Sequence, residues 1–279
     1  MSTDTIIGLI ALAALFAAEG WRPAYTGRRQ RLRHGANNLG LAAVSAAAGA
    51  LTAPLLVLSV ETAAAHGIGL CHALDLRWPA CAALTFVLFD GWMYAWHRAN
   101  HRVPFLWRFH RVHHTDPAMD STTALRFHPG EILLSALANC LVLMALGMSL
   151  GMLVVYKSAM VLVILLHHSN LAVPAQLDAR LRRLIVPPSM HRVHHSAVRA
   201  ETDSNYGTVF SFWDRLFGSF RLRDDPEAIR FGIGAYDDPT WQRPLRLLRL
   251  PLEPSPSRGG GRDRDRDRAD LSPAAEAKP

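Results

Sequence analysis

The strongest constraint on the fold is a run of 25 residues, 132–156, without a single charged side chain. About 20 apolar residues cross a bilayer as a helix, and a run this long exceeds an ordinary core helix. Further apolar blocks cover residues 5–18, 39–60, 79–96 (interrupted only by Asp90) and 158–166. We therefore predict an all-α, multi-pass transmembrane helical bundle of about four to five spans, with buried helices of a large soluble protein as the alternative.

The charge distribution also favours a membrane as the partner. The formal net charge is +7, and all but two of the 30 basic residues are arginines. Arginines crowd between Arg22 and Arg33, after the first apolar block, and arginine and lysine mark the cytoplasmic side of membrane proteins. We therefore expect no nucleic acid partner. We place residues 97–129 and 168–279 in the cytoplasm and 61–78 outside, and the arginine-rich, lysine-poor composition suggests a bacterial inner membrane.

Composition divides the chain into four segments. Residues 1–84 are expected to hold N-terminal membrane helices and loops, and 85–225 a histidine-rich catalytic domain that includes a transmembrane hairpin. Residues 226–253 form a cytoplasmic C-terminal segment. Residues 254–279 combine proline, glycine and alternating arginine and aspartate, so this tail is predicted to be disordered.

The three cysteines are expected to be free thiols. Cys71, Cys81 and Cys140 have apolar neighbours and no metal-type spacing, and their number is odd. These features argue against a disulfide framework.

Histidines are concentrated in short tracts. The pentapeptide His-Arg-Val-His-His occupies residues 110–114 and recurs unchanged at 191–195, and His97 and His101 precede the first copy. Residues three and four apart share a helix face, so each tract can present its imidazoles to one side. Imidazole suits iron, zinc, copper and nickel. Eight histidines exceed what one ion can coordinate, and they therefore predict two metal ions in a cytoplasmic helical cap.

Two more histidines join the predicted ligands, because His128 and His168 lie beside apolar spans. The set is His97, His101, His110, His113, His114, His128, His168, His191, His194 and His195. About five ligands per ion leave room for water or dioxygen, whereas a closed structural zinc site needs four. His34, His66 and His72 are expected to be ordinary interfacial residues, and the role of His167 stays open.

Two carboxylates are candidates to support these ligands. Metal-bound histidines usually donate their second N–H to a carboxylate, a carbonyl or water. Asp90 lies seven residues before His97, two turns back along a helix, and Glu131 follows His128 by three residues. The alternatives are an ion pair of Asp90 with an arginine and a helix-start role for Glu131.

The order of these motifs resembles the fatty acid hydroxylase/sterol desaturase superfamily over residues 85–220. The resemblance rests on the tracts Asp90–His101, Leu106–His114, Arg126–Pro129, His168–Asn170, Met190–His195, Asn205–Gly207 and Trp213–Gly218. It implies a di-iron enzyme that uses dioxygen to hydroxylate or desaturate a C–H bond of a lipid. The ligand positions of the family fall on the ten histidines, and we add Asn205 to Asp90 and Glu131 as supporting catalytic residues.

The expected chemistry selects the cofactor. No side chain oxidises an unactivated C–H bond, so a redox cofactor must do so, and zinc has no redox chemistry. We expect two iron ions, which zinc can replace during purification, with dioxygen as co-substrate. The sequence carries no nicotinamide or flavin fingerprint, so a separate redox protein or a reduced pterin is expected to supply electrons. A membrane dimetal hydrolase and a metal carrier or transporter are the competing readings.

Overall fold

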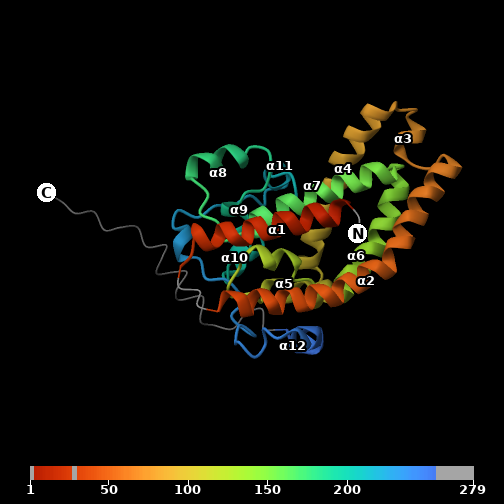
Figure 1. Ribbon diagram of the computed structural model, residues 1–279. Helices are drawn as coiled ribbons and strands as arrows, with labels where there is room; N and C mark the ends of the chain where they lie inside the picture. Colours follow the sequence, from red (N-terminus) through yellow and green to blue (C-terminus); the bar gives the residue numbers. More distant parts are fainter. Residues whose placement is uncertain (1–2, 27–29, 256–279) are drawn as a thin grey trace.

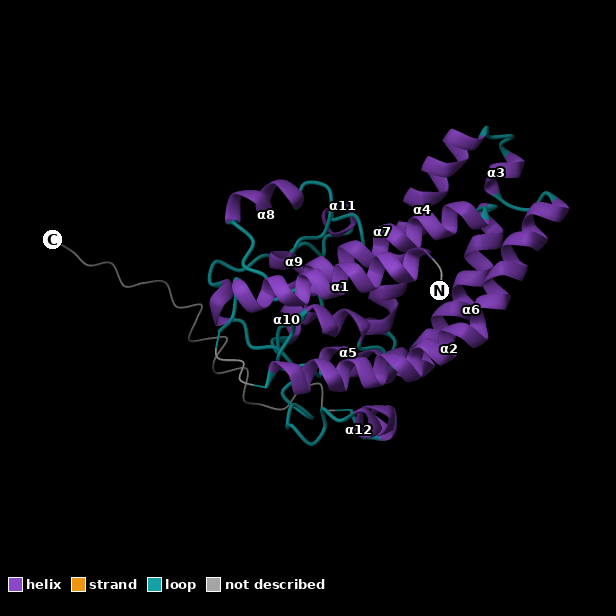
Figure 2. Ribbon diagram, viewed as in Figure 1, coloured by secondary structure: helices purple, strands orange, loops and turns teal. Residues whose placement is uncertain are grey.

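The protein is helical throughout the part of the chain that the structure covers. A computed structural model describes residues 3–26 and 30–255. Within these ranges the chain forms α- and 3-10 helices and isolated β-bridges but no strand (Figure 2). The predicted all-α class is therefore confirmed. Most of the tail predicted to be disordered, residues 256–279, lies outside the described residues.

The described residues form five long helices and ten short ones, and Figure 1 shows their arrangement. The long ones are α1 (Thr3–Trp21), α2 (Arg31–His66), α4 (Trp78–Arg102), α6 (Pro129–Leu146) and α7 (Leu150–His168). The short ones are α3 (Leu70–Ala73), α5 (Pro104–His114), η1 (Ser121–Leu125), α8 (Ala175–Leu181), α9 (Pro188–His194), α10 (Arg199–Thr202), α11 (Phe212–Leu216), η2 (Pro226–Ala228), α12 (Pro244–Arg249) and η3 (Leu250–Leu252). Figure 1 shows α8, α9 and α10 at the end of the molecule opposite α3.

Among the described residues, three helical segments are long and apolar enough to cross a membrane. They are Arg31–Ala73, Pro129–Leu146 and Leu150–His168, which overlap the uncharged blocks at 39–60, 132–156 and 158–166. The first block forms a shorter apolar helix, and α4, which contains the 79–96 block, is not among the three. The expected count of four to five spans is therefore not confirmed.

The hairpin of α6 and α7 turns at Gly147. Gly147 adopts a left-handed conformation with φ of 66°, and this ends α6. Glycine takes this conformation without the steric cost that a Cβ imposes. Two residues later, the Ser149 side chain accepts a hydrogen bond from the backbone N–H of Met152 and starts α7. Buried Leu143 and Tyr156 then pack with Phe89 of α4 in the largest apolar cluster of the described residues.

The prediction of free thiols was wrong for two cysteines. Cys71 and Cys81 form a disulfide with a Cα–Cα distance of 5.5 Å, and Cys140 is free. An odd number of cysteines excludes complete pairing but not one pair. The turn between α3 and α4 folds the chain back, so residues ten apart in sequence come within bonding distance.

His34 also differs from its predicted role as an ordinary interfacial residue. Its Nε2 lies 2.8 Å from an Asp116 oxygen, and its Nδ1 lies 3.0 Å from an Asp120 oxygen. The ring thus links α2 to the segment before η1. Burial raises the pKa of Asp116, but the charges of His34 and Arg126 outweigh it and hold that pKa well below its usual value.

Candidate metal centre

Nine of the ten predicted ligands converge in two groups. The five-histidine group consists of His97, His101, His110, His114 and His194. The four-histidine group consists of His113, His168, His191 and His195. Within each group, one nitrogen from every ring lies within 4.8 Å of the others, and all nine side chains except His97 are buried. Helices α4, α5, α7 and α9 supply eight of them, and His195 directly follows α9. These nine histidines, which the sequence was expected to bring together, therefore do lie together.

The two copies of the repeated pentapeptide exchange their middle histidines. The first and last histidines of the α5 copy, His110 and His114, lie in the five-histidine group, and its middle one, His113, lies in the other. The second copy is divided the opposite way: His191 and His195 join His113, and His194 joins the five-histidine group. Each group is therefore built from both copies.

Acceptors fix the outer ring nitrogens of five of the nine histidines, and most of these acceptors are backbone carbonyls. The Nδ1 atoms of the other four, His101, His114, His191 and His195, have no hydrogen-bond partner. Nδ1 of His97 donates to the Tyr206 carbonyl at 2.9 Å, and Nδ1 of His194 donates to the Ser204 carbonyl at 2.7 Å. The Nδ1 of His168 similarly bonds the Ile164 carbonyl at 2.7 Å. A carbonyl can only accept, so each Nδ1 carries the hydrogen and each neutral ring turns a bare Nε2 inward.

The inward nitrogens approach one another closely. Nε2 of His168 lies 3.0 Å from Nε2 of both His113 and His191, and Nε2 of His191 lies 3.2 Å from that of His195. Metal–nitrogen bonds of about 2.0–2.1 Å would allow nitrogens this close to bind one ion together. Facing lone pairs repel, so a shared cation would stabilise this arrangement.

The inward-facing histidine nitrogens are not protonated near neutral pH, so their lone pairs still repel one another. Burial is the main cause that lowers the pKa of His113 and His195 well below the usual value, and it lowers that of His194 to about 3. These rings are therefore neutral and available to bind metal. The buried Nε2 atoms of His97, His101 and His194 have no hydrogen-bond partner. The residues thus fit metal ions on the chemistry of their donor atoms.

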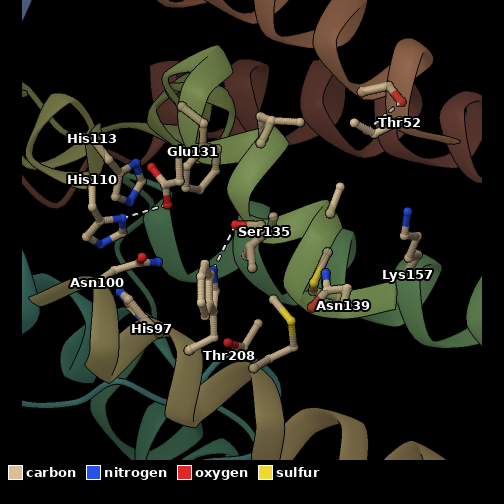
Figure 3. Close-up of a pocket in the computed structure, with 18 of the residues that line it drawn as sticks. Thr52, His97, Asn100, His110, His113, Glu131, Ser135, Asn139, Lys157 and Thr208 are labelled. Carbon is tan, nitrogen blue, oxygen red and sulfur yellow. Dashed lines mark hydrogen bonds and ion pairs between the residues drawn. The ribbon is translucent and has the colours of Figure 1, made fainter. Parts of the chain in front are cut away.

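Glu131 contacts the five-histidine group. Its Oε1 accepts a hydrogen bond from Nδ1 of His110 at 2.8 Å (Figure 3). Glu131 lies in the first turn of α6, so this contact connects a membrane-type helix to the histidines on α5. The geometry is that of the carboxylate support expected from the sequence, and the role itself stays a prediction.

His128 lies outside both groups, although it was predicted as a ligand. Its Nδ1 accepts from the backbone N–H of Gly130 at 2.9 Å, and its Nε2 contacts the Leu248 carbonyl at 3.2 Å. Both ring nitrogens are thus engaged in capping α6 and holding the C-terminal segment. The residue before a helix-starting proline is the N-cap position, where a side-chain acceptor satisfies an unpaired backbone N–H.

Asp90 was expected to support a histidine, and it contacts none. Its oxygens accept hydrogen bonds from the Tyr156 hydroxyl, the backbone N–H groups of Val209 and Phe210, and the Trp213 indole, at 2.8–3.1 Å. Seven residues separate Asp90 from His97, so they share a helix face but lie about 10 Å apart along the axis. Asp90 therefore ties α4 to α7 and to the chain before α11.

The side chain of Asn205 forms hydrogen bonds with backbone groups and with none of the nine histidines. The residue has φ of 51°, and its side chain bonds the Met190 carbonyl and the backbone of Arg221. Asp214 accepts from the next two backbone N–H groups, those of Tyr206 and Gly207, at 2.7 and 2.9 Å. These bonds hold the Tyr206 carbonyl where it accepts from His97. Sequence reasoning missed the carbonyls of Tyr206, Ser204 and Ile164, because a backbone acceptor leaves no residue-type signal.

His167, whose role the sequence left open, lies against the four-histidine group without belonging to it. Its ring stacks on His191 with centroids 3.8 Å apart, and both of its buried ring nitrogens have no hydrogen-bond partner.

A largely apolar cavity of about 300 Å³ opens onto the histidines. Residues of α2, α4, α6 and α7 form its walls, among them Leu56, Met93, Ile132 and Met160. Histidines of both groups, His97, His110, His113, His168 and His191, line it. Figure 3 shows His97, His110 and His113 together at one end of this space.

Comparison with known proteins identifies the class. The family model described as fatty acid hydroxylase matches residues 82–219, the segment that contains all nine converging histidines. Residues 82–219 therefore form a fatty acid hydroxylase domain. No solved structure matches the chain significantly.

Curated relatives are hydroxylases and monooxygenases that act on lipids. The chain is 30% identical to an ornithine lipid hydroxylase from Rhizobium tropici, over 58% of this chain and 49% of the relative. It is 32% identical to an alkylglycerol monooxygenase from Caenorhabditis elegans, over 55% and 30% of the two chains. It is 24% identical to a cholesterol 25-hydroxylase from Rattus norvegicus, over 54% and 50%. The matched segment thus spans half or less of each of these relatives.

Proposed function

We propose that the protein is an integral membrane oxidoreductase that uses dioxygen and two iron ions to hydroxylate or desaturate a C–H bond of a lipid. The observation that carries the proposal is the position of two histidine groups at the wall of an apolar cavity between membrane-type helices. The relatives, which oxidise lipids according to their names, support the reaction class.

The histidines have a division of roles in this proposal. The five-histidine group holds one ion and the four-histidine group the other, through inward-facing Nε2 atoms. Iron, when bound, supplies the redox chemistry that no side chain offers. Glu131 and the carbonyls of Tyr206, Ser204 and Ile164 fix the orientation of the rings and raise their basicity.

The cavity gives a reason for a lipid substrate. Its apolar walls match a hydrocarbon chain, and the helices that form them are long enough to lie in a bilayer. A lipid can therefore reach the histidines from the membrane without crossing water. We place the histidine end on the cytoplasmic face, in a bacterial inner membrane, where a separate redox protein or a reduced pterin would supply the electrons.

A direct test combines purified protein with lipid. The protein, purified in detergent and loaded with ferrous iron, would receive a reductant, a lipid extract and isotopically heavy dioxygen. Incorporation of heavy oxygen into a lipid is the expected result for hydroxylation, and loss of two hydrogens is expected for desaturation. Product formed equally well without oxygen would instead support the dimetal hydrolase. Lipid profiles of cells with and without the gene, under limited oxygen, would then identify the substrate.

A further inference from the structure

One lysine lies in the wall of the cavity, inside an otherwise uncharged stretch of α7. Lys157 is the eighth residue of this helix, and it lines the same cavity as the histidines. In Figure 3 it lies toward the end of the cavity away from His97, His110 and His113. A snorkelling lysine would direct its ammonium group to the membrane surface. An ionisable residue that faces a cavity within a membrane-type helix instead marks a binding function.

A second polar group of the cavity wall, on α6, adds hydrogen-bond donors. Asn139 lines the same cavity and, like Lys157, lies away from His110 and His113 in Figure 3. Its Oδ1 accepts from the Trp92 indole at 2.7 Å, so the amide is oriented with Oδ1 toward Trp92. The two N–H bonds of Nδ2 are then the groups that Asn139 offers to the cavity. Lys157 likewise has only donors.

The two ends of the cavity therefore differ in chemistry. The histidines and Glu131 line one end, and the N–H donors of Lys157 and Asn139 line the other. Lys157 precedes His168 by eleven residues, which corresponds to about 16 Å along the helix axis. Asn139 follows Glu131 by eight residues, or about 12 Å. Apolar side chains such as Met93 and Met160 lie among the wall residues.

We propose that Lys157 and Asn139 bind an oxygen-acceptor group at one end of a long-chain lipid and so fix which carbon reaches the histidines. A carboxylate is the strongest form of this ligand, because an ammonium group and an amide both donate to it and its charge is matched. The substrate is then an apolar chain whose acceptor group lies on the order of 12–16 Å from the attacked carbon. The inference about the attacked carbon rests on the proposed oxidation, whereas the binding of the acceptor group does not.

Binding can be measured without turnover. Metal-loaded protein under anaerobic conditions would be titrated with a fluorescent fatty acid, which is then displaced by a long-chain carboxylate, the alcohol of the same length and the alkane. We expect the carboxylate to bind about ten- to a hundredfold more tightly than the alkane. The Lys157→Met variant should lose most of this advantage, and Asn139→Leu part of it. Val155→Leu, on the exposed side of the same helix, is the matched control and should keep it.

Each outcome decides the proposal. If only the alcohol binds more tightly than the alkane, and Lys157→Met or Asn139→Leu reduces this difference, the acceptor group is a hydroxyl and the proposed role of Lys157 and Asn139 is supported. No advantage for either polar ligand, or an advantage unchanged in both variants, would overturn it. Should Lys157→Met fail to fold, Lys157→Gln removes the charge from a side chain that stays polar and makes the same test.

The position of oxidation gives a second, independent readout. With substrates of increasing length, the new hydroxyl or double bond should stay at a constant number of carbons from the acceptor end, and Lys157→Met should broaden this distribution. A position counted from the methyl end would contradict the inference. If no oxidation occurs at all, the proposed function fails, while the displacement experiment still decides whether Lys157 binds the acceptor group.

Discussion

His113 and His194 hold the same position in the two copies of the repeated pentapeptide, and each lies in the group that contains the outer two histidines of the other copy. Neither group can therefore form from one copy. Helices α5 and α9 must both be in place before either set of nitrogens converges, and residues 115–187 lie between these helices. Any ion bound by a group would then link two distant parts of the chain.

Because each group contains histidines from both copies, two substitutions in different copies can affect the same group. We expect the double variant His113→Ala/His195→Ala, which changes both copies but only the four-histidine group, to lose about one of two bound ions and to keep the other. If each copy held its own ion, this variant would weaken both sites instead. Metal analysis after dialysis against a chelator distinguishes the two cases. His66→Ala, at the exposed end of α2, should keep its full metal content.

Glu131→Gln tests the carboxylate beside His110. Glutamine preserves the size of the side chain but removes the charge that favours donation from Nδ1 of His110. Loss of such a contact typically costs about 10- to 100-fold in metal affinity or activity. We expect a weaker metal affinity in a chelator titration, with little change in the thermal unfolding of the metal-free protein. Ser135→Ala, one turn further along α6, should leave the affinity within about twofold.

The sequence indicates which histidines come together but not which groups surround them. Histidine spacing on a helix reports which rings share a face, so nine of ten predicted ligands converge. Helix spacing was not sufficient for Asp90, because two residues that share a helix face can still lie far apart along the helix axis. His128 lies apart from both groups because it occupies the N-cap position before a proline, and the residue type alone does not distinguish such a cap from a metal ligand. The division of the repeat between two groups depends on how α5 and α9 pack, which no local pattern records.

Asp90→Asn should act on stability rather than on catalysis. Asp90 accepts four hydrogen bonds and donates none, and an asparagine would turn N–H groups toward donors such as the Phe210 amide. A buried group left unpaired in this way costs about 1–3 kcal/mol. We expect a lower unfolding midpoint and unchanged turnover per bound iron. A selective loss of turnover per iron, with normal stability, would restore the role predicted from the sequence, in which Asp90 supports a ligand histidine.

His128 should be dispensable for metal binding. His128→Asn retains a side-chain acceptor for the Gly130 N–H, and His128→Ala removes it. The alanine variant should lose about 1 kcal/mol of stability, as for other N-cap losses, and the asparagine variant less. Metal content should equal that of the unchanged protein in both. A loss of metal in the asparagine variant would contradict the assignment of His128 as a cap.

The metal-free protein should lose stability as the pH falls below about 6.5. Burial holds the pKa of His194 at about 3, and burial also lowers the pKa of His113, His114, His191 and His195 well below its usual value. In the unfolded chain these histidines return to a pKa of about 6.5, so between these limits the unfolded state binds more protons than the folded state. The free energy of unfolding therefore decreases by up to about 1.4 kcal/mol per pH unit for each such histidine. Above about pH 7.5 the rings are neutral in both states, so the free energy of unfolding no longer depends on pH through these histidines.

Thermal unfolding in chelator between about pH 7.5 and pH 5 measures how steeply the free energy of unfolding falls as the pH falls. The variant His194→Asn removes one titrating ring and should make this slope shallower by up to about 1.4 kcal/mol per pH unit. A midpoint that stays constant over this range would show that the rings are not held neutral in the folded protein.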